Sequence, residues 1–179
     1  MRVQRFGEHR AMPWANGRGT SYEIASDRDA TNHWSWRVAI APVVEDGQFS
    51  SFAGVDRELA VIDGNGMVLE VDGESVECLP GRVIRFSGDS TTLARLVDGP
   101  VVDLGLMTVR DSVIGSMVVI ADVGDVIESD VIVAVGDAVF EDENGEHYIL
   151  GSKDALLDVR GHQLVLLSGM SIAMKTKSL

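Results

Sequence analysis

The sequence predicts an all-β fold built from many short strands. Apolar and polar residues alternate with a period of two along most of the chain, and glycine-rich turns separate the alternating runs. No amphipathic helical stripe of convincing length interrupts this pattern, and residues 109–117 come nearest to one. Many short strands at this spacing are typical of a β-sandwich or a β-barrel.

Two stretches near the N-terminus carry the first expected strands. Residues 12–25 place Trp14 and two glycines ahead of a strand, although turns are usually built from small polar residues. From residue 34 to residue 41 the side chains alternate, so that the apolar ones share one face. Arg37 lies on the other face among small neighbours, which leave room beside its guanidinium group.

The next two apolar runs lead into a predicted hairpin. Residues 57–63 form one strand, and a glycine-rich turn leads into a second strand over residues 67–71. Asp72 and Gly73 then occupy the two central positions of a hairpin turn that requires positive φ angles. This turn pairs residues 67–71 with residues 74–78, leaving one face buried and the other exposed to water.

The remaining alternating runs predict further strands along the rest of the chain. We expect them at residues 82–86, 91–97, 101–109, 117–123, 131–135, 147–150, 155–159, 163–167 and 171–175. Weak self-similarity around Pro80 and Gly161 favours two fused β-barrel halves. We therefore divide the chain into an N-terminal domain, 1–110, and a smaller C-terminal domain, 111–179, packed tightly on the first.

The composition describes an ordinary globular protein and excludes several classes of function. The chain has 179 residues and a net charge of −13, which argues against binding to nucleic acid or to anionic membranes. It lacks an apolar run long enough for a transmembrane helix, and its N-terminus lacks the apolar core of a signal peptide. The single cysteine, Cys78, cannot form an internal disulfide. These features predict a cytoplasmic protein.

No motif for a metal, a cofactor or a covalent nucleophile is recognisable in the sequence. The four histidines, His9, His33, His147 and His162, include no closely spaced pair of the kind that binds a metal in a β-barrel. The nucleophile motif Gly-x-Ser-x-Gly is absent, and the glycine-rich turns lack the spacing and the lysine of a phosphate-binding loop. We therefore expect neither a metal nor a cofactor.

Arginines within apolar strands are the strongest candidates for a binding site. Arg37 and Arg57 each carry a planar, permanently charged group that suits a bidentate carboxylate. On a protein of net charge −13, an anionic ligand needs such local positive charge. The alternative for Arg37 is a structural ion pair with Glu23 or Asp103, because buried charges are normally paired.

The loop that follows Trp14 also has two interpretations. As part of a site, it folds over the mouth of a barrel, where Trp14 forms an apolar wall beside Asn16 and Thr20. As ordinary structure, Trp14 packs in the core, and Asn16 with Gly17 supplies a left-handed turn. In that second interpretation, Thr20 and Glu23 simply begin and face an exposed strand.

These segments together are similar to the HutD/Ves family. Over about residues 10 to 111 the chain carries that family's tryptophan-asparagine-glycine loop, its Trp-Arg strand, its Asp-Gly-x-Phe-Ser turn and its Gly-x-Asp-Arg strand. The resemblance implies a cupin-like double-stranded β-barrel, duplicated as a bicupin and without the usual metal ligands. It also implies a role in bacterial histidine utilisation, as a sensor of urocanate or of a formylated glutamate derivative, with no established enzymatic activity.

Carried over residue by residue, the resemblance marks a set of ligand-binding positions. They are Trp14, Asn16, Thr20, Glu23, Arg37, Phe49, Ser50, Arg57 and Asp103. It also marks Gly17, Gly19, Trp36, Phe52, Gly54 and Met107. Two positions depart from the family pattern, because Gly105 replaces an asparagine and Ala39 replaces a serine. If either side chain normally contacts the ligand, this chain lacks that hydrogen bond.

The sequence leaves three functions open. The first, which we favour, is a non-enzymatic binding protein for a small carboxylate, acting as a metabolic sensor or regulator. The second is a metal-independent isomerase or hydrolase, with Glu23 or Asp103 as general base near Arg37. The third is a module whose acidic surface docks a basic protein partner. Besides these partners, we allow for a second copy of the chain in a homodimer.

Overall fold

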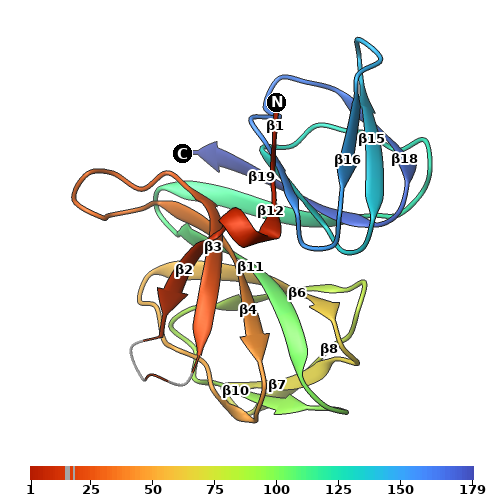
Figure 1. Ribbon diagram of the computed structural model, residues 1–179. Helices are drawn as coiled ribbons and strands as arrows, with labels where there is room; N and C mark the ends of the chain where they lie inside the picture. Colours follow the sequence, from red (N-terminus) through yellow and green to blue (C-terminus); the bar gives the residue numbers. More distant parts are fainter. Residues whose placement is uncertain (15–16, 18) are drawn as a thin grey trace. The chain divides into compact units, whose positions relative to one another are not determined.

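The computed structural model describes residues 1–14, 17 and 19–179, and its regular elements are almost all β-strands (Figure 1). They form four sheets, and in each the neighbouring strands are hydrogen-bonded. One short 3-10 helix, η1, spans Phe6–Glu8. Among the described residues, no helix has the length and apolar character needed to cross a membrane. The all-β prediction is confirmed.

The chain divides into two compact units. One unit contains Arg10–Gly115 with Lys177–Leu179, and the other contains Met1–His9 with Ser116–Thr176. This division differs from the predicted domains 1–110 and 111–179 mainly at the N-terminus, where Met1–His9 joins the later residues. The cause is a strand pairing between segments far apart in the chain, which leaves no signal in the local sequence.

The Arg10–Gly115 unit holds two sheets that share one apolar core. The six-stranded sheet has the order β2 (Arg10–Pro13), β3 (Thr20–Ser26), β4 (Trp36–Val43), β11 (Val101–Val109), β6 (Val55–Asp63) and β9 (Val83–Ser87). The four-stranded sheet has the order β5 (Gly47–Gln48), β10 (Thr92–Leu96), β7 (Met67–Val71) and β8 (Glu74–Cys78). Both contribute to a core of Val43, Leu59, Val61, Met67, Leu69, Cys78, Ile84, Ala94 and Val101.

The predicted hairpin is present in the four-stranded sheet. β7 and β8 pair antiparallel, with Met67 opposite Cys78 and Val71 opposite Glu74. Asp72 and Gly73 have φ angles of 49° and 88°, as the two-residue turn requires. Met67 and Cys78 are fully buried, whereas most of β8 is exposed, so one face is buried and the other faces water.

The second unit also has two sheets around a core of its own. The five-stranded sheet has the order β1 (Arg2–Gln4), β17 (Ala155–Leu157), β14 (Val131–Ala134), β19 (Ser171–Ser178) and β12 (Val113–Ile120). The four-stranded sheet has the order β13 (Val126–Ile127), β18 (Leu164–Ser168), β15 (Ala138–Asp142) and β16 (His147–Leu150). Side chains from both sheets, including Phe140, Leu150, Leu156 and Leu166, form the core. β12 and β19 each extend a few residues past the boundary between the units.

Some strands depart from the predicted boundaries. β12 begins at Val113 rather than at residue 117. The segment 109–117, which carries a weak helical stripe, is therefore a turn over residues 110–112 followed by strand, consistent with the β-branched residues at 113 and 114. β15 was not among the predicted strands, although Ala138, Phe140 and Asp142 alternate inward. The last of these inward positions is a carboxylate that accepts hydrogen bonds from the backbone of the following turn, which weakens the apolar pattern.

Candidate functional site

A cavity of about 360 Å³ lies within the Arg10–Gly115 unit, against one face of the six-stranded sheet. Its walls come from β2, β3, β4, β6 and β11, and from the segment 48–52. The lining is mostly apolar or aromatic, with a small number of charged side chains that converge on the same space. This combination is typical of a small-molecule site.

Three rows of residues across β4, β11 and β6 form the floor of the cavity. In the first row, Met107 of β11 lies between Arg37 and Arg57. In the second, Gly105 lies between Ala39 and Leu59, and in the third, Asp103 lies between Ala41 and Val61. Because side chains two apart on a strand point to the same face, these rows project together. The cationic row and the acidic row are thus separated by a row of small and apolar residues.

Arg57 is a half-buried cation held among aromatic rings. Its guanidinium carbon lies 5.1 Å from the ring centre of Phe49, 5.6 Å from that of Phe52 and 4.9 Å from that of Phe86. Its Nη1 donates a hydrogen bond to the carbonyl oxygen of Ser50, at 3.2 Å. Burial lowers the pKa of Arg57 to about 10, although the charge of Asp103 opposes this shift. Cation–π contacts therefore stabilise a charge that has no ion pair among the described residues.

Arg37 is a second cation at the cavity, and its pairing is incomplete. Its Nε lies 3.8 Å from Glu23 Oε2 and is buried without a hydrogen-bond partner among the described residues. The guanidinium carbon lies 5.7 Å from the ring centre of Trp34. Burial lowers the pKa of Arg37, which Glu23 opposes. Arg37 thus has unused hydrogen-bonding capacity beside an open space.

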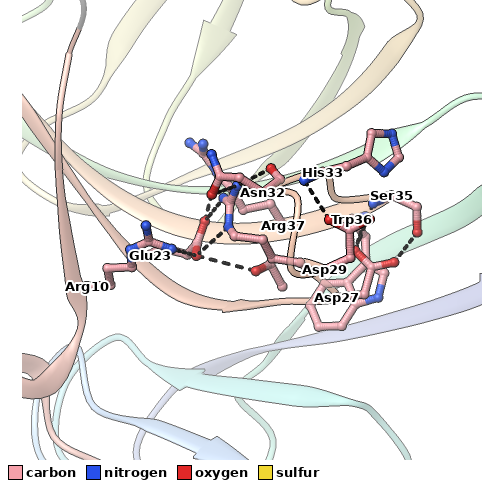
Figure 2. Close-up of polar contacts among 11 residues, drawn as sticks. Arg10, Glu23, Asp27, Asp29, Asn32, His33, Ser35, Trp36 and Arg37 are labelled. Carbon is pink, nitrogen blue, oxygen red and sulfur yellow. Dashed lines mark hydrogen bonds and ion pairs between the residues drawn. The ribbon is translucent and has the colours of Figure 1, made fainter.

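Glu23 lies close to both Arg10 and Arg37 (Figure 2), but it is engaged mainly by another residue, Arg28. Arg28 Nη2 lies 2.5 Å from Glu23 Oε2, whereas the closest approach of Arg10 is 3.7 Å. Ser26 also donates to this carboxylate, at 3.3 Å. Glu23 is therefore a buried carboxylate that forms several ion pairs, and the alternative that it faces solvent on an exposed strand is wrong. It does not belong to the cavity lining.

Asp103 is the acidic residue of the cavity lining that has no partner among the described residues, whereas Glu58 pairs with Arg85. Asp103 is 6% exposed and makes no hydrogen bond or ion pair with any described residue. Burial raises the pKa of Asp103 to about 7, against the opposing effect of the Arg57 charge. The alternative that Asp103 pairs with Arg37 is wrong, because no such ion pair forms between these two described residues. A buried acceptor without a donor is costly, so this group is suited to receive one from a ligand.

The glycines after Trp14 explain how an aromatic ring reaches the cavity wall from a loop. Gly17 has a φ angle of 70°, which favours glycine, and its amide donates to the Trp14 carbonyl. A Cβ on Gly19 would lie 2.7 Å from two ring atoms of Trp14, so only glycine lets the ring pack against this backbone. The ring is fixed by a 2.8 Å hydrogen bond from Trp14 Nε1 to Ser21 Oγ.

The structure brings six of the nine predicted ligand-binding residues to this cavity: Trp14, Arg37, Phe49, Ser50, Arg57 and Asp103. Thr20 begins β3 opposite Pro13 and does not line the cavity, and neither does Glu23. Asn16 lies outside the described residues.

Part of the lining was not predicted as ligand-binding: Met12, Pro13, Ser21, Ala39, Ala41, Val43, Gln48, Phe52, Glu58, Leu59, Gly105, Leu106 and Met107. A signal for several of them was available. Positions 39, 41, 59, 105 and 107 follow from Arg37, Arg57 and Asp103 by the period of two on paired strands. The register between distant strands was the missing information.

No group of three or more metal-binding side chains occurs among the residues that the structure describes. In this cavity, arginines stand beside Asp103, while Glu58, the other acidic residue of the lining, is paired with Arg85. This set of side chains suits an anion rather than a cation.

Comparison with solved structures shows close relatives over nearly the whole chain. HutD from Pseudomonas fluorescens SBW25, in a formate condition, is 31% identical, with a TM-score of 0.83 and coverage of 99% of this chain and 98% of that one. A conserved protein from Pseudomonas aeruginosa PAO1 is 28% identical, with a TM-score of 0.84 and the same coverage of 99% and 98%. A cupin 2 conserved barrel domain protein from Leptotrichia buccalis is only 9% identical but has a TM-score of 0.61, which indicates the cupin fold.

Curated relatives match a shorter stretch of the chain. A 21.2 kDa protein in the hutC 3′ region of Pseudomonas putida is 38% identical over 109 residues, which are 60% of this chain and 57% of that protein. Protein Ves of Citrobacter koseri is 36% identical over 107 residues, which are 57% of this chain and 56% of that protein. The match thus spans a little over half the length of these two relatives.

The HutD family model matches residues 7–174, in agreement with the resemblance found in the sequence. Together with the 31% identical HutD structure, this match shows that the chain belongs to the HutD family.

Proposed function

We propose that the Arg10–Gly115 unit binds a small organic carboxylate and acts as a sensor rather than as an enzyme. The observation that carries this proposal is a cavity of about 360 Å³ into which two arginines, the buried Arg37 and the half-buried Arg57, project without a full set of partners. A buried cation without a counter-ion is unfavourable, so an anion that enters the cavity removes a cost already present in the free protein.

The size and the walls of the cavity favour a small organic ligand with one flat side. A volume of about 360 Å³ lies at the lower end of the range for small-molecule sites. Trp14, Phe49 and Phe52 supply aromatic surface, and the guanidinium groups supply forked donors for a carboxylate. The cavity therefore suits a small free carboxylate rather than a segment of a large polymer.

The names of the relatives suggest the metabolic setting. One relative is named HutD and another is named for its place beside hutC, which connects the family with histidine utilisation. We propose urocanate or a formylglutamate-like compound as the ligand, because both are small carboxylates of that pathway. A change in ligand occupancy would then report the pathway's activity to a regulatory partner.

A calorimetric titration of the whole protein tests the proposal. Urocanate and formylglutamate are titrated, with the methyl ester of urocanate as the matched control that lacks the carboxylate. We expect saturable binding of at least one free acid, little binding of the ester, and a rise in melting temperature with ligand concentration. If neither acid binds, or if the acid and its ester bind equally well, the cavity is not a carboxylate site.

A second candidate function rests on a different observation, the state of Asp103. A buried carboxylate whose pKa is raised to about 7 has the property that a general acid or base needs at neutral pH. It supports a metal-independent isomerase or hydrolase that acts on the same carboxylate. NMR spectra of urocanate and formylglutamate, recorded over time in the presence of the protein, distinguish the sensor from the enzyme. A sensor leaves both compounds unchanged, whereas an enzyme converts one of them.

A further inference from the structure

We infer that the ligand of this cavity has two different ends, and that Asp103 selects it. One end is a carboxylate held between Arg37 and Arg57, and the other is an N–H or O–H donor that reaches Asp103. This inference rests on the proposed function and adds the class of ligand that the site takes.

The separation of the charged rows along β11 is the first reason. Met107, between the two arginines, and Asp103 are four residues apart on one strand, which corresponds to about 13 Å between their Cα atoms. Arg57 is close enough to oppose the rise in the pKa of Asp103, yet the two side chains form no ion pair. The cavity lies between these charges, so a ligand longer than a simple anion is needed to contact both.

The surroundings of Asp103 are the second reason. Its neighbours across β4 and β6 are Ala41 and Val61, which offer no hydrogen bond. The titratable groups that face it are Arg57 from β6 and Cys78 from β8, and burial raises the pKa of the Cys78 thiol to about 12. None of these described groups donates a hydrogen bond to Asp103. A donor on the ligand would satisfy an acceptor that the protein leaves open.

The row between the charges indicates what joins the two ends of the ligand. Ala39 and Gly105 lie opposite each other, and both lack polar side-chain atoms. A Cβ on Gly105 would approach the carbonyl oxygens of Glu58 and Ala39 only to 3.9 and 4.0 Å, so the space above this glycine is open. A flat, uncharged group fits over this row, and the asparagine and serine of the family pattern are missing at these two positions.

Two probes that differ only in the donor test this inference. Urocanate carries an imidazole N–H at the end opposite its carboxylate, and 3-(2-furyl)acrylate has the same length and flatness without any donor. Both are titrated calorimetrically at pH 8, above the pKa of about 7 at which Asp103 loses its proton. We expect the wild type to bind urocanate at least tenfold more tightly. Asp103→Val, which removes the acceptor in apolar surroundings, should bind both probes within about twofold of each other.

The outcomes separate this inference from the proposed function. If the wild type binds neither probe nor any other carboxylate, the proposed function itself fails. If it binds both probes equally, or binds the donor-free dicarboxylate glutarate as tightly as urocanate, the carboxylate site stands and the two-ended ligand is overturned. A preference for urocanate that survives in Asp103→Val also overturns it. Asp103→Leu, which is close to aspartate in shape and has no acceptor, replaces the valine variant should that variant not fold.

Discussion

Arg57 and Asp103 project into the same cavity with opposite charges and yet form no ion pair. Aromatic rings surround the arginine, and apolar neighbours flank the aspartate. Burial lowers the pKa of Arg57 to about 10 and raises the pKa of Asp103 to about 7, so each charged form is disfavoured in the free protein. Such cost is typical of a functional site, where a ligand later compensates it.

The first prediction concerns the pH dependence of stability. The pKa of Asp103 is raised from 3.8 to about 7 on folding. The folded state therefore holds this proton more tightly than the unfolded state, and stability is lost as the pH rises from about 4 through 7. Asp103→Asn removes the titrating group. We expect its free energy of unfolding, relative to wild type, to increase by on the order of 3 kcal/mol between pH 4.5 and pH 8.

Denaturant unfolding of both proteins at the two pH values measures this difference. Asp111→Asn serves as the control, because Asp111 is an exposed aspartate of the same unit. The control should follow the wild type at both pH values. A constant difference between Asp103→Asn and wild type would show that Asp103 is ionised throughout, as an ordinary aspartate is.

The second prediction concerns Arg37. Arg37→Lys keeps the charge but loses the forked geometry, so carboxylate binding should weaken by about 1.5–3 kcal/mol, with folding nearly intact. Calorimetry and thermal unfolding measure the two effects, with Arg95→Lys as the control, because Arg95 is an exposed partner of Glu70. A lowered melting temperature with unchanged binding would instead identify Arg37 as a structural partner of Glu23.

The third prediction concerns the wall formed by Trp14. In Gly19→Ala the new methyl group would lie 2.7 Å from the indole ring, so the ring must shift from its position in the cavity wall. Loss of one aromatic contact corresponds to about 0.5–1.5 kcal/mol, and ligand affinity should fall about twofold to tenfold. Gly47→Ala, with no atom within 4 Å of the new Cβ, should bind normally. Equal affinity of the two variants would exclude Trp14 from the binding wall.

The fourth prediction concerns metals. The cavity is lined by arginines together with Asp103 and Glu58, and the described residues contain no group of three or more metal-binding side chains. We expect elemental analysis to find much less than one transition metal per chain, and a chelator to leave both the melting temperature and ligand binding unchanged. About one bound iron, zinc or nickel per chain, lost together with ligand binding on chelation, would contradict a metal-independent site.

The sequence by itself determined the succession of short alternating strands, the hairpin at Asp72–Gly73 and the face on which Arg37 lies. These features are local, because alternation of side chains along a strand and the φ angles of a tight turn depend on neighbouring residues only. The tertiary structure alone decided that Arg28 pairs most closely with Glu23 and that Met1–His9 joins residues Ser116–Thr176. It also decided that Asp103 lines the same cavity as Arg57 and has no hydrogen-bond donor among the described residues. The last two outcomes depend on the pairing of strands remote in sequence, which arises from burying a common core rather than from any single segment. Arg28 lies only five residues after Glu23, but the conformation of the chain that follows β3 decides whether the two side chains meet.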